Sequence, residues 1–438
     1  MINEKKLNRR CFLKKLSTGV ATGLAAPAFV PASVLGKTGT VAPGNRIVMA
    51  AIGVGWMGTE DLTWFLGEHD AQVVAVCDID RNHLLNAKEI VDKKYGNNHC
   101  ATYHDFRNVL ARTDIDAVIL GLPDHWHSIP AILAAKSGKD IYAEKPLSHT
   151  LREGRAMCDA VERYQRIWQT GSWQRSEANF RFACELVLNG RIGKVHTVQV
   201  GLPSGHTDFA GTKGQDELKT PPPELDYDFW LGPAPYFPYA VSRIHKNWRW
   251  VLEYGGGQLM DWVGHHVDIA HWGLGFDDSG PCEIDGYGDF PESGHYNAPT
   301  RYRLTAKYPR DITMIIAGGH DDIKGGTKWI GDKGWVHVDR GVLDAFPETL
   351  LSEKFDPGEI HLLESPGHTR NFLDCVKSRQ QPLAPCHVAH RSATPGHLGM
   401  VAMTLGRKLR WDHKTETVID DPRANALLGK AMRSPWHL

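Results

Sequence analysis

One short segment near the start of the chain constrains its fold more than any other. Residues 46–52 have the apolar pattern of a buried strand, and residues 59–67 have a helical pattern. Between them the chain reads Gly-Val-Gly-Trp-Met-Gly. Glycine suits this turn because the backbone must approach a pyrophosphate and the helix must pack close to the strand. The pattern predicts a dinucleotide site at the helix N-terminus. We expect cofactor contacts from Gly53, Gly55, Trp56, Met57 and Gly58.

An acidic residue follows the second predicted strand. Residues 72–77 form an apolar run that ends at Asp78, twenty residues beyond Gly58. A carboxylate at this offset accepts hydrogen bonds from the adenosine ribose and repels a 2′-phosphate. We therefore expect NAD as the cofactor, in preference to NADP.

Strand-like and helix-like segments alternate beyond this point. Helical patterns cover residues 82–95, 106–112, 129–136 and 151–164, and strand patterns cover 117–122, 140–143 and 168–170. The alternation predicts an α/β fold with a doubly wound, parallel Rossmann sheet and a ligand crevice at the carboxyl ends of its strands. Polar clusters follow two of these strands. From them we expect cofactor contacts by Asp124, His127, Glu144 and Lys145.

A more specific signal is Ala143-Glu144-Lys145-Pro146. With the glycine turn, Asp78 and a downstream Asp261-x-x-x-His265, it makes the chain resemble the Gfo/Idh/MocA oxidoreductases from about residue 47 to the C-terminus. The resemblance implies a second α/β domain whose large, mostly antiparallel sheet walls the active site, and assembly as a homodimer or homotetramer. It also implies that Lys145 lies beside the nicotinamide and the substrate hydroxyl, with Asp261 and His265 as its catalytic partners.

The residue types support these roles independently. Asp261, His265 and Asp268 lie four and three residues apart in a helix-like segment at 258–272, so we expect them on one face. Oxidation of a secondary alcohol requires a base for the hydroxyl proton, and histidine suits this task. Lys145 can stabilise the developing alkoxide, and Asp261 can orient His265 or bind a neighbouring hydroxyl. A helix whose polar side faces water is the alternative interpretation of this segment.

The same segment also raises the question of a metal site, because histidine and carboxylate are common ligands. The residues concerned are Asp261, His265, His266, Asp268 and His271. Hydride transfer to nicotinamide requires no metal, so we expect none.

A long Pro/Gly-rich segment, residues 203–239, leads to a cluster of aromatic and polar residues before the glycines that precede Asp261. Connections of this length are usually functional. Aromatic faces interleaved with hydrogen-bonding groups suit a sugar. We expect substrate contacts from Trp173, Arg175, Trp248, Arg249, Asp261 and His265. The alternative is that several of the fourteen tryptophans belong to the core.

The first forty residues have the order of an export signal. Arg9 and Arg10 precede Phe-Leu-Lys at 12–14, residues 16–36 are uncharged, and Ala-Pro-Ala at 26–28 offers a cleavage site. The segment resembles a twin-arginine signal and is too weakly apolar for a stable membrane span. We expect export of the folded protein to the periplasm or another extracytoplasmic location, with membrane contact only through the signal. The alternative is a basic tail followed by an ordinary helix.

Length and composition set the remaining limits. The 438 residues suit two domains. We expect a signal and linker at 1–40, an NAD-binding Rossmann domain at 45–172, and a substrate and oligomerisation domain at 173–438. The net charge of −1 argues against a nucleic-acid partner. The eight cysteines contain no CxxC pair, so we expect free, mostly buried thiols.

The export signal and the nucleotide motif together suggest how the cofactor is used. No pool of NAD(H) is known outside the cytoplasm, so an exported enzyme is expected to carry tightly bound NAD and to recycle it in place. One cycle oxidises a secondary hydroxyl of a sugar, glycoside or cyclitol and then reduces a second carbonyl compound. The alternative cycle is that of an NAD-dependent glycosidase, in which transient ring oxidation permits elimination, water addition and re-reduction.

We rank oxidoreduction first because Asp261-x-x-x-His265 resembles the dehydrogenase branch more than the Thr-His-Gly pattern of the family's hydrolases. A third interpretation is a binding protein that contains NAD without catalysis. The joint presence of Lys145, Asp261 and His265 argues against it, because a binding protein needs no acid–base set.

Overall fold

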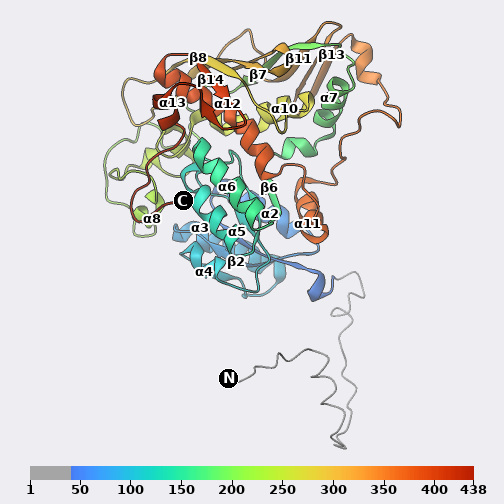
Figure 1. The fold of residues 1–438 in the computed structure, drawn as a ribbon. Coiled ribbons are helices and arrows are strands. Elements are labelled where there is room, and N and C mark those ends of the chain that lie inside the picture. Colours follow the sequence, from blue (N-terminus) through green and yellow to red (C-terminus); the bar gives the residue numbers. More distant parts are fainter. Residues whose placement is uncertain (1–40) are drawn as a thin grey trace, which may run out of the picture. The chain divides into compact units, whose positions relative to one another are not determined.

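The computed structural model describes residues 41–438 (Figure 1). The predicted signal motif and cleavage site lie outside the described residues. A 3₁₀ turn at Pro43–Asn45 precedes the body of the chain, which runs from Ile47 to Leu438. In the described residues, no helix is long and apolar enough to cross a membrane.

The first half of the body forms a six-stranded sheet with all strands parallel, in the order β3-β2-β1-β4-β5-β6. This is the doubly wound Rossmann arrangement that the alternating segments predict. Its strands are β1 (Ile47–Ile52), β2 (Ala71–Cys77), β3 (Ala101–Tyr103), β4 (Ala117–Leu120), β5 (Asp140–Ala143) and β6 (Trp168–Thr170). Of these, only the short β3 was absent from the predicted pattern.

Helices cover both faces of this sheet because its strands are apolar on both sides. One face packs against α4 (Phe106–Leu110), α5 (Ser128–Lys136) and α6 (Leu151–Arg163). The other packs against α2 (Trp56–Gly67) and α3 (Arg81–Tyr95).

A helix from the far end of the chain joins that second face. Figure 1 shows α11 (His368–Ser378) beside α2, and its Phe372 ring lies 5.8 Å from that of Phe65. The last third of the chain therefore contributes to the core of the nucleotide-binding sheet.

The second sheet has nine strands in the order β13-β12-β11-β7-β10-β9-β8-β14-β15, and β7 with β10 is its one parallel pair among the described strands. The expected large, mostly antiparallel sheet is confirmed. Its strands are β7 (Val195–Leu202), β8 (Glu283–Asp289), β9 (Arg301–Tyr308), β10 (Ile312–Gly318), β11 (Gly326–Gly331), β12 (Trp335–Asp339), β13 (Val342–Phe346), β14 (Leu409–Asp412) and β15 (Thr417–Val418).

Three helices bury one face of this sheet in the largest apolar cluster of the described residues (Figure 1). They are α7 (Ala178–Leu188), α10 (Asp268–Leu274) and α12 (Cys386–Leu405). The remaining helices are α8 (Tyr227–Leu231), α9 (Gly257–Trp262) and α13 (Pro422–Ala426).

The predicted continuous helix at 258–272 is wrong in one respect. The segment consists of α9, a π-helical turn at Val263–Val267, and α10. A π-turn has i→i+5 hydrogen bonds and adds a residue to one turn, so the α-helical spacing does not hold across it. His265 lies in the middle of this turn.

The described cysteines are all free thiols, as expected, and all but Cys282 are buried. Two of them, Cys158 on α6 and Cys386 on α12, lie with their Sγ atoms 3.3 Å apart. This contact joins the nucleotide-binding half to the C-terminal part of the chain.

Candidate active site

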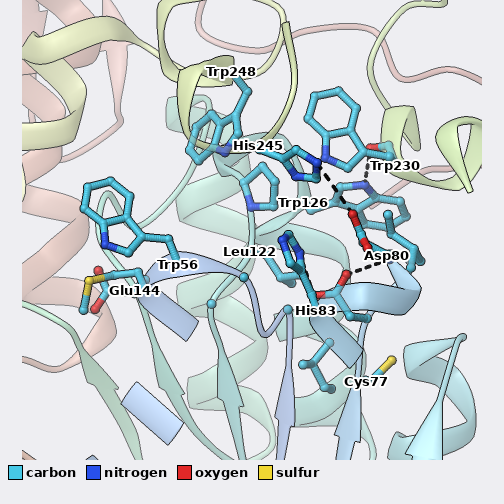
Figure 2. Close-up of a pocket in the computed structure, with 18 of the residues that line it drawn as sticks. Trp56, Cys77, Asp80, His83, Leu122, Trp126, Glu144, Trp230, His245 and Trp248 are labelled. Atoms are coloured by element: carbon cyan, nitrogen blue, oxygen red, sulfur yellow. Dashed lines mark hydrogen bonds and ion pairs between the residues drawn. The ribbon is translucent and has the colours of Figure 1, made fainter. Parts of the chain in front are cut away.

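A cavity lies at the carboxyl ends of the parallel strands, where doubly wound sheets bind their ligands. It is lined by Gly53 after β1, by Asp78 after β2 and by Glu144 after β5. Figure 2 shows Trp56 and Glu144 at one end and Trp126 and Trp230 at the other. An elongated cavity of this kind suits a dinucleotide.

The glycine turn has the close backbone contacts that its sequence predicts. Gly53 has φ +77°, and a Cβ on Gly58 would lie 1.9 Å from the carbonyl oxygen of Gly53. A Cβ on Gly121, which follows β4, would lie 2.4 Å from Cα of Gly58. Gly55 caps α2 without a side-chain hydrogen bond, so the first N–H groups of the helix remain available to an anion.

Asp78 is held in place in the cavity wall by two backbone amides. Its Oδ2 accepts a hydrogen bond from the Val54 amide at 2.8 Å, and its Oδ1 accepts one from the Asp80 amide at 2.9 Å. Burial raises the pKa of Asp78, while His83 and these two amides oppose the rise. The fixed carboxylate keeps further lone pairs for ribose hydroxyls.

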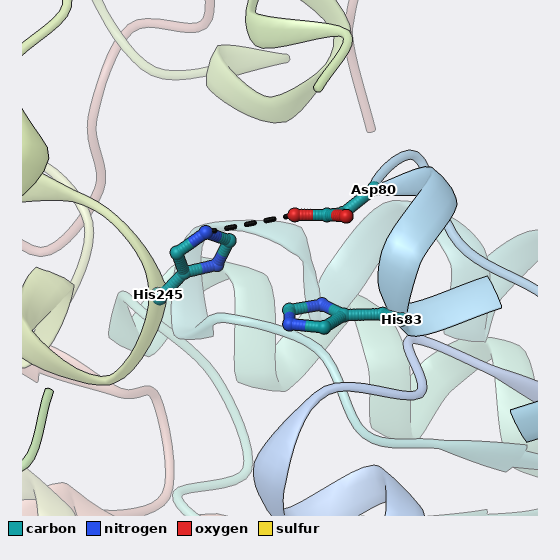
Figure 3. Close-up of side chains that lie close together, drawn as sticks. All are labelled: Asp80, His83 and His245. Carbon is teal, nitrogen blue, oxygen red and sulfur yellow. Dashed lines mark ion pairs between the residues drawn. The ribbon is translucent and has the colours of Figure 1, made fainter. Parts of the chain in front are cut away.

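The side chains of Asp80, His83 and His245 lie close together (Figure 3), and Nδ1 of His83 lies 3.9 Å from Asp78 Oδ2. Nε2 of His245 lies 3.6 Å from Asp80 Oδ2, and the rings of His83 and His245 lie 5.0 Å apart. One ring nitrogen of each histidine and one carboxylate oxygen of Asp80 all lie within 4.8 Å of one another. All three line the cavity, so they belong to the ribose end of the nucleotide site.

Aromatic side chains enclose the far end of the cavity, where an adenine ring would fit. Phe106 and Trp126 come from the Rossmann half, and Phe229 and Trp230 come from the long Pro/Gly-rich segment. The indole N–H of Trp126 donates to the Trp230 carbonyl at 2.8 Å, and an isolated bridge pairs Asp80 with Leu225. These contacts were not predicted from the sequence, because no local sequence pattern indicates which part of the protein a long segment packs against.

At the opposite end, Lys145 and Asp261 are in direct contact. The Lys145 ammonium donates to Asp261 Oδ1 at 3.0 Å and to the Asp261 carbonyl at 3.1 Å. Nε of Arg249 lies 3.2 Å from the same carboxylate oxygen. Burial alone would raise the pKa of Asp261, but the two cations outweigh it and lower that pKa to about 2. Asp261 is therefore ionised at neutral pH.

His265 is buried next to this pair. A Cβ on Gly264 would lie 3.0 Å from the Lys145 Cβ, so the π-helical turn packs directly on the lysine. Burial, followed by the charges of Lys145 and Arg340, lowers the pKa of His265 well below its ordinary value. The imidazole is neutral, and its Nδ1 has no hydrogen-bond partner among the described residues. A neutral imidazole is competent to accept a proton.

Glu144 is a second buried acid in the cavity wall. Burial raises its pKa to about 7, although Lys145 opposes the rise. Behind it lies Asp61 of α2, which is fully buried and whose pKa is raised by burial and by repulsion from Glu144. Neither carboxylate oxygen of Asp61 has a partner among the described residues. The two acids hold their protons more tightly than ordinary carboxyl groups do.

Some predicted site residues have other partners. Arg175 is 2% exposed and forms ion pairs of 2.7 Å with Asp268 and with Asp277, so the structure does not place its guanidinium in the cleft. This pairing also draws Asp268 away from Asp261. The two ring nitrogens of His127 lie 2.7 and 2.8 Å from backbone carbonyl oxygens, one of which can accept the single N–H of the neutral ring, and the ring does not line the cavity.

Other predicted residues lie in or near the cavity. Trp248, Arg249 and Asp124 line the cavity, and Trp173 lies 6.2 Å from the His265 ring. Two of the three histidines weighed as metal ligands have other neighbours: His271 pairs with the Tyr308 hydroxyl at 2.8 Å, and His266 faces Asp339 at 3.5 Å.

Dehydrogenases that use a nicotinamide cofactor combine a phosphate-binding glycine turn with a proton-transfer group at the far end of the same crevice. This chain has both parts. The family model described as the NAD-binding Rossmann fold of the oxidoreductase family matches residues 47–172, and the model of the C-terminal alpha/beta domain matches residues 177–438. The chain therefore belongs to the Gfo/Idh/MocA oxidoreductase family.

Curated relatives match a shorter part. A glycosyl hydrolase family 109 protein of Solibacter usitatus is 29% identical over 167 residues, covering 37% of this chain and 38% of the relative. An alpha-N-acetylgalactosaminidase of Shewanella oneidensis is 30% identical over 178 residues, covering 36% and 38%. The chain thus spans less than half the length of these relatives.

Solved structures share the fold over most of the chain. One of them is the WlbA dehydrogenase of Bordetella pertussis in complex with NADH and UDP-GlcNAcA, which matches with a TM-score of 0.61 at 17% sequence identity. The matched region covers 84% of this chain and 99% of the WlbA chain. At this identity the likeness establishes the fold.

Proposed function

We propose that this protein is an NAD-dependent oxidoreductase that acts on a secondary hydroxyl of a sugar, glycoside or cyclitol. The observation that carries the proposal is the Lys145–Asp261 contact beside the neutral His265, at one end of a dinucleotide cavity. The glycine turn would hold the pyrophosphate and Asp78 the ribose. Carbohydrate-related relatives support the substrate class.

The chain's own residues can perform the proton chemistry. His265 accepts the hydroxyl proton, because burial and Lys145 keep its imidazole unprotonated. The Lys145 ammonium, fixed by Asp261, stabilises the oxygen as negative charge develops on it. A bound nicotinamide supplies the hydride acceptor and donor. The reverse order of the same steps reduces a carbonyl compound.

The second candidate function is that of an NAD-dependent glycosidase. It is favoured by the two relatives described above, a glycosyl hydrolase family 109 protein and an alpha-N-acetylgalactosaminidase. Its cycle needs the same oxidation, followed by loss of the acidified C–H proton and protonation of the departing aglycone. Glu144, with a pKa raised to about 7, is a second group in the cavity wall that can carry a proton at neutral pH.

We also propose that the cofactor is bound tightly, is loaded before export by the twin-arginine route, and is recycled in place. The aromatic side chains that line the adenine end support slow release, because their contacts with a bound adenine would have to be broken before the dinucleotide leaves. The Arg9-Arg10 motif supports export. The family resemblance further suggests a homodimer or homotetramer, which light scattering would measure.

Cofactor content provides the first test. The protein is purified from its export route without added nucleotide and denatured, and the released compound is identified by mass spectrometry. We expect about one NAD(H) per chain. A purified, folded protein with no nucleotide would contradict preloading.

Turnover provides the second test. The holoprotein is mixed with sugars, glycosides and cyclitols, absorbance near 340 nm is followed, and products are identified. A reduced cofactor with a keto-sugar supports oxidoreduction, whereas released aglycone without net redox change supports hydrolysis. Lys145→Ala and His265→Ala should each lower kcat at least a hundredfold, as expected for loss of a proton-transfer group. Lys354→Ala, at an exposed position, is the control. Full activity of either site variant would contradict the proposed roles.

A further inference from the structure

An arginine absent from the sequence predictions lies at the edge of the candidate active site. Arg340 occupies the turn between β12 and β13 and is exposed. Its guanidinium lies 4.5 Å from the ring centre of Trp173 and 4.6 Å from that of Trp262. Cation–π contacts with two indoles hold the group in one place.

The turn that carries Arg340 is itself fixed. The side-chain amide of Asn179 on α7 donates to the Asp339 carbonyl at 2.9 Å and to the Val342 carbonyl at 3.4 Å. Gly341 has φ +70°, which permits the tight reversal. The guanidinium is therefore presented by a rigid hairpin rather than by a loose loop.

The same two indoles flank His265. The His265 ring lies 5.4 Å from that of Trp262 and 6.2 Å from that of Trp173. Both tryptophans are partly exposed, Arg340 is exposed, and His265 is buried. The four side chains thus form a continuous path from a cation at the rim to a neutral base in the interior.

The charges along this path do not cancel. Asp261 is shared by Lys145 and Arg249, which leaves one carboxylate for two cations. Within the described part of the chain, no carboxylate lies at ion-pair distance from the Arg340 guanidinium. Its neighbour Asp339 accepts the Arg340 backbone amide and faces His266. The region therefore carries excess positive charge toward solvent.

We propose that Arg340 binds an anionic group of the substrate and that the preferred substrates are acidic sugars. A guanidinium offers parallel donors that match a carboxylate. The partly exposed indoles suit the apolar C–H face of a sugar ring. A sugar held in this way can reach His265 and Lys145 with a ring hydroxyl. This inference rests on the proposed function and narrows its substrate class.

Binding to the holoprotein provides the test, independently of turnover. Titration calorimetry compares D-glucose, D-glucuronate and D-glucose 6-sulfate, with the matched galactose series run in parallel. The two anionic probes distinguish a carboxylate from a sulfate ester. We expect at least one anionic sugar to bind about tenfold or more tightly than its neutral counterpart, as charge-assisted hydrogen bonds imply.

Arg340→Gln should remove this preference and leave the affinity for the neutral sugar within about twofold, because only the charged contact is lost. Lys333→Gln is the matched control: it deletes one positive charge at the turn that precedes β12, the end of the strand opposite Arg340. It should leave the preference unchanged.

Equal binding of neutral and anionic sugars, no binding of either anionic probe, or an unchanged preference in Arg340→Gln would each overturn the inference. A failure of the proposed oxidoreductase function would give a different result from a failure of this inference. In that case the cofactor would stay unchanged with every sugar, neutral or acidic, and Lys145→Ala would behave like the native protein.

Discussion

Two buried acids of the candidate site differ in ionisation because their neighbours differ. Asp261 lies 3.0 Å from one cation and 3.2 Å from another, and its pKa falls to about 2. Glu144 has no ion pair within 4.0 Å among the described residues, and burial raises its pKa to about 7. At neutral pH the first is fully charged and the second is partly protonated. One site thus contains both a permanent anion and a proton carrier.

Glu144 predicts a dependence of stability on pH. Its folded pKa lies above the ordinary value of 4.5, so its contribution to stability is complete below about pH 4.5 and is lost as the pH rises through about 7. Glu144→Gln removes this loss. Relative to the native protein, the variant should gain up to about 3 kcal/mol between pH 5 and pH 8. Thermal unfolding at both pH values measures the change.

The control is Glu60→Gln, an exposed position on the neighbouring helix α2, which should show the same pH dependence as the native protein. A Glu144→Gln protein whose stability falls with pH as steeply as the native one would show that another group is responsible.

Arg175 is a structural residue whose removal should be costly. It pairs with Asp268 and Asp277 inside the protein, so Arg175→Leu leaves Asp268 buried without a counter-charge. We expect a loss of about 3–5 kcal/mol in the free energy of unfolding. Urea unfolding checks this value. Arg410→Ala breaks the exposed 2.7 Å pair with Asp420 and should change stability by less than about 1 kcal/mol.

At the scale of the element, the π-helical turn determines the position of His265, the proposed base. Residues 258–272 have a sequence pattern that suits a continuous helix, but the extra residue in one turn separates Asp261 and His265 from Asp268. The first two face Lys145, and Asp268 turns to Arg175. π-turns of this kind are frequent at functional sites.

The entry to α2 supplies a second test at this scale. Gly58→Ala would place a methyl group 1.9 Å from the Gly53 carbonyl oxygen, a backbone atom that cannot move without displacing the turn. We expect NAD affinity to fall at least tenfold, because the helix N-terminus leaves the pyrophosphate site. Equilibrium dialysis of the nucleotide-free protein with NAD measures this.

Gly67→Ala, at the other end of the same helix, is the matched control. Nothing lies within 4 Å of its added methyl group, so binding should be unchanged and stability should rise by about 0.5–1 kcal/mol. Equal NAD affinity in the Gly58 and Gly67 variants would contradict the assigned role of the turn.

At the scale of the whole molecule, the adenine end of the cavity is assembled from distant parts of the chain. Phe229 from the long segment stacks on Trp436 near the C-terminus, with ring centres 5.6 Å apart. Trp436 also lies 4.8 Å from Trp126, which lines the cavity. The Arg433 amide donates to the Pro233 carbonyl and ties the C-terminal segment to the same region.

This arrangement predicts that the C-terminal segment controls cofactor release. Trp436→Ala removes the ring that supports both Phe229 and Trp126, and we expect NAD to dissociate about ten times faster, in line with the loss of an aromatic contact. Retention of nucleotide during repeated dilution and filtration measures the rate. Trp335→Ala, on β12 in the second sheet, should retain NAD as the native protein does.

Much of the fold could be predicted because its signals are local. The bounds of β5 and β6 agree with the predicted segments to the residue, and the glycine turn lies in the cavity at the ends of the parallel strands. The short β3 and the return of α11 to the first sheet were missed. Three residues carry too little pattern for a strand to be recognised, and the docking of a helix depends on surfaces that lie far away in the sequence.

The residues of the candidate site also fall into those that were predicted from the sequence and those that were not. Lys145, Asp261 and His265 were predicted from short motifs and the family resemblance, and in the structure Lys145 contacts Asp261 and the turn that carries His265. Arg340, the adenine-side aromatic residues and the burial of Arg175 were not found. Each depends on a partner more than sixty residues away, such as Trp262 for Arg340 or Asp268 for Arg175.

The sequence by itself determined the succession of strands and helices and the glycine turn, because backbone conformation responds to neighbours within a few positions. The tertiary structure alone decided which of the charged residues face the cavity and which neutralise one another inside the protein. The physical reason is that burial and charge pairing arise from packing between distant segments. These two effects, and not the residue type, set the ionisation of Asp261, Glu144 and His265.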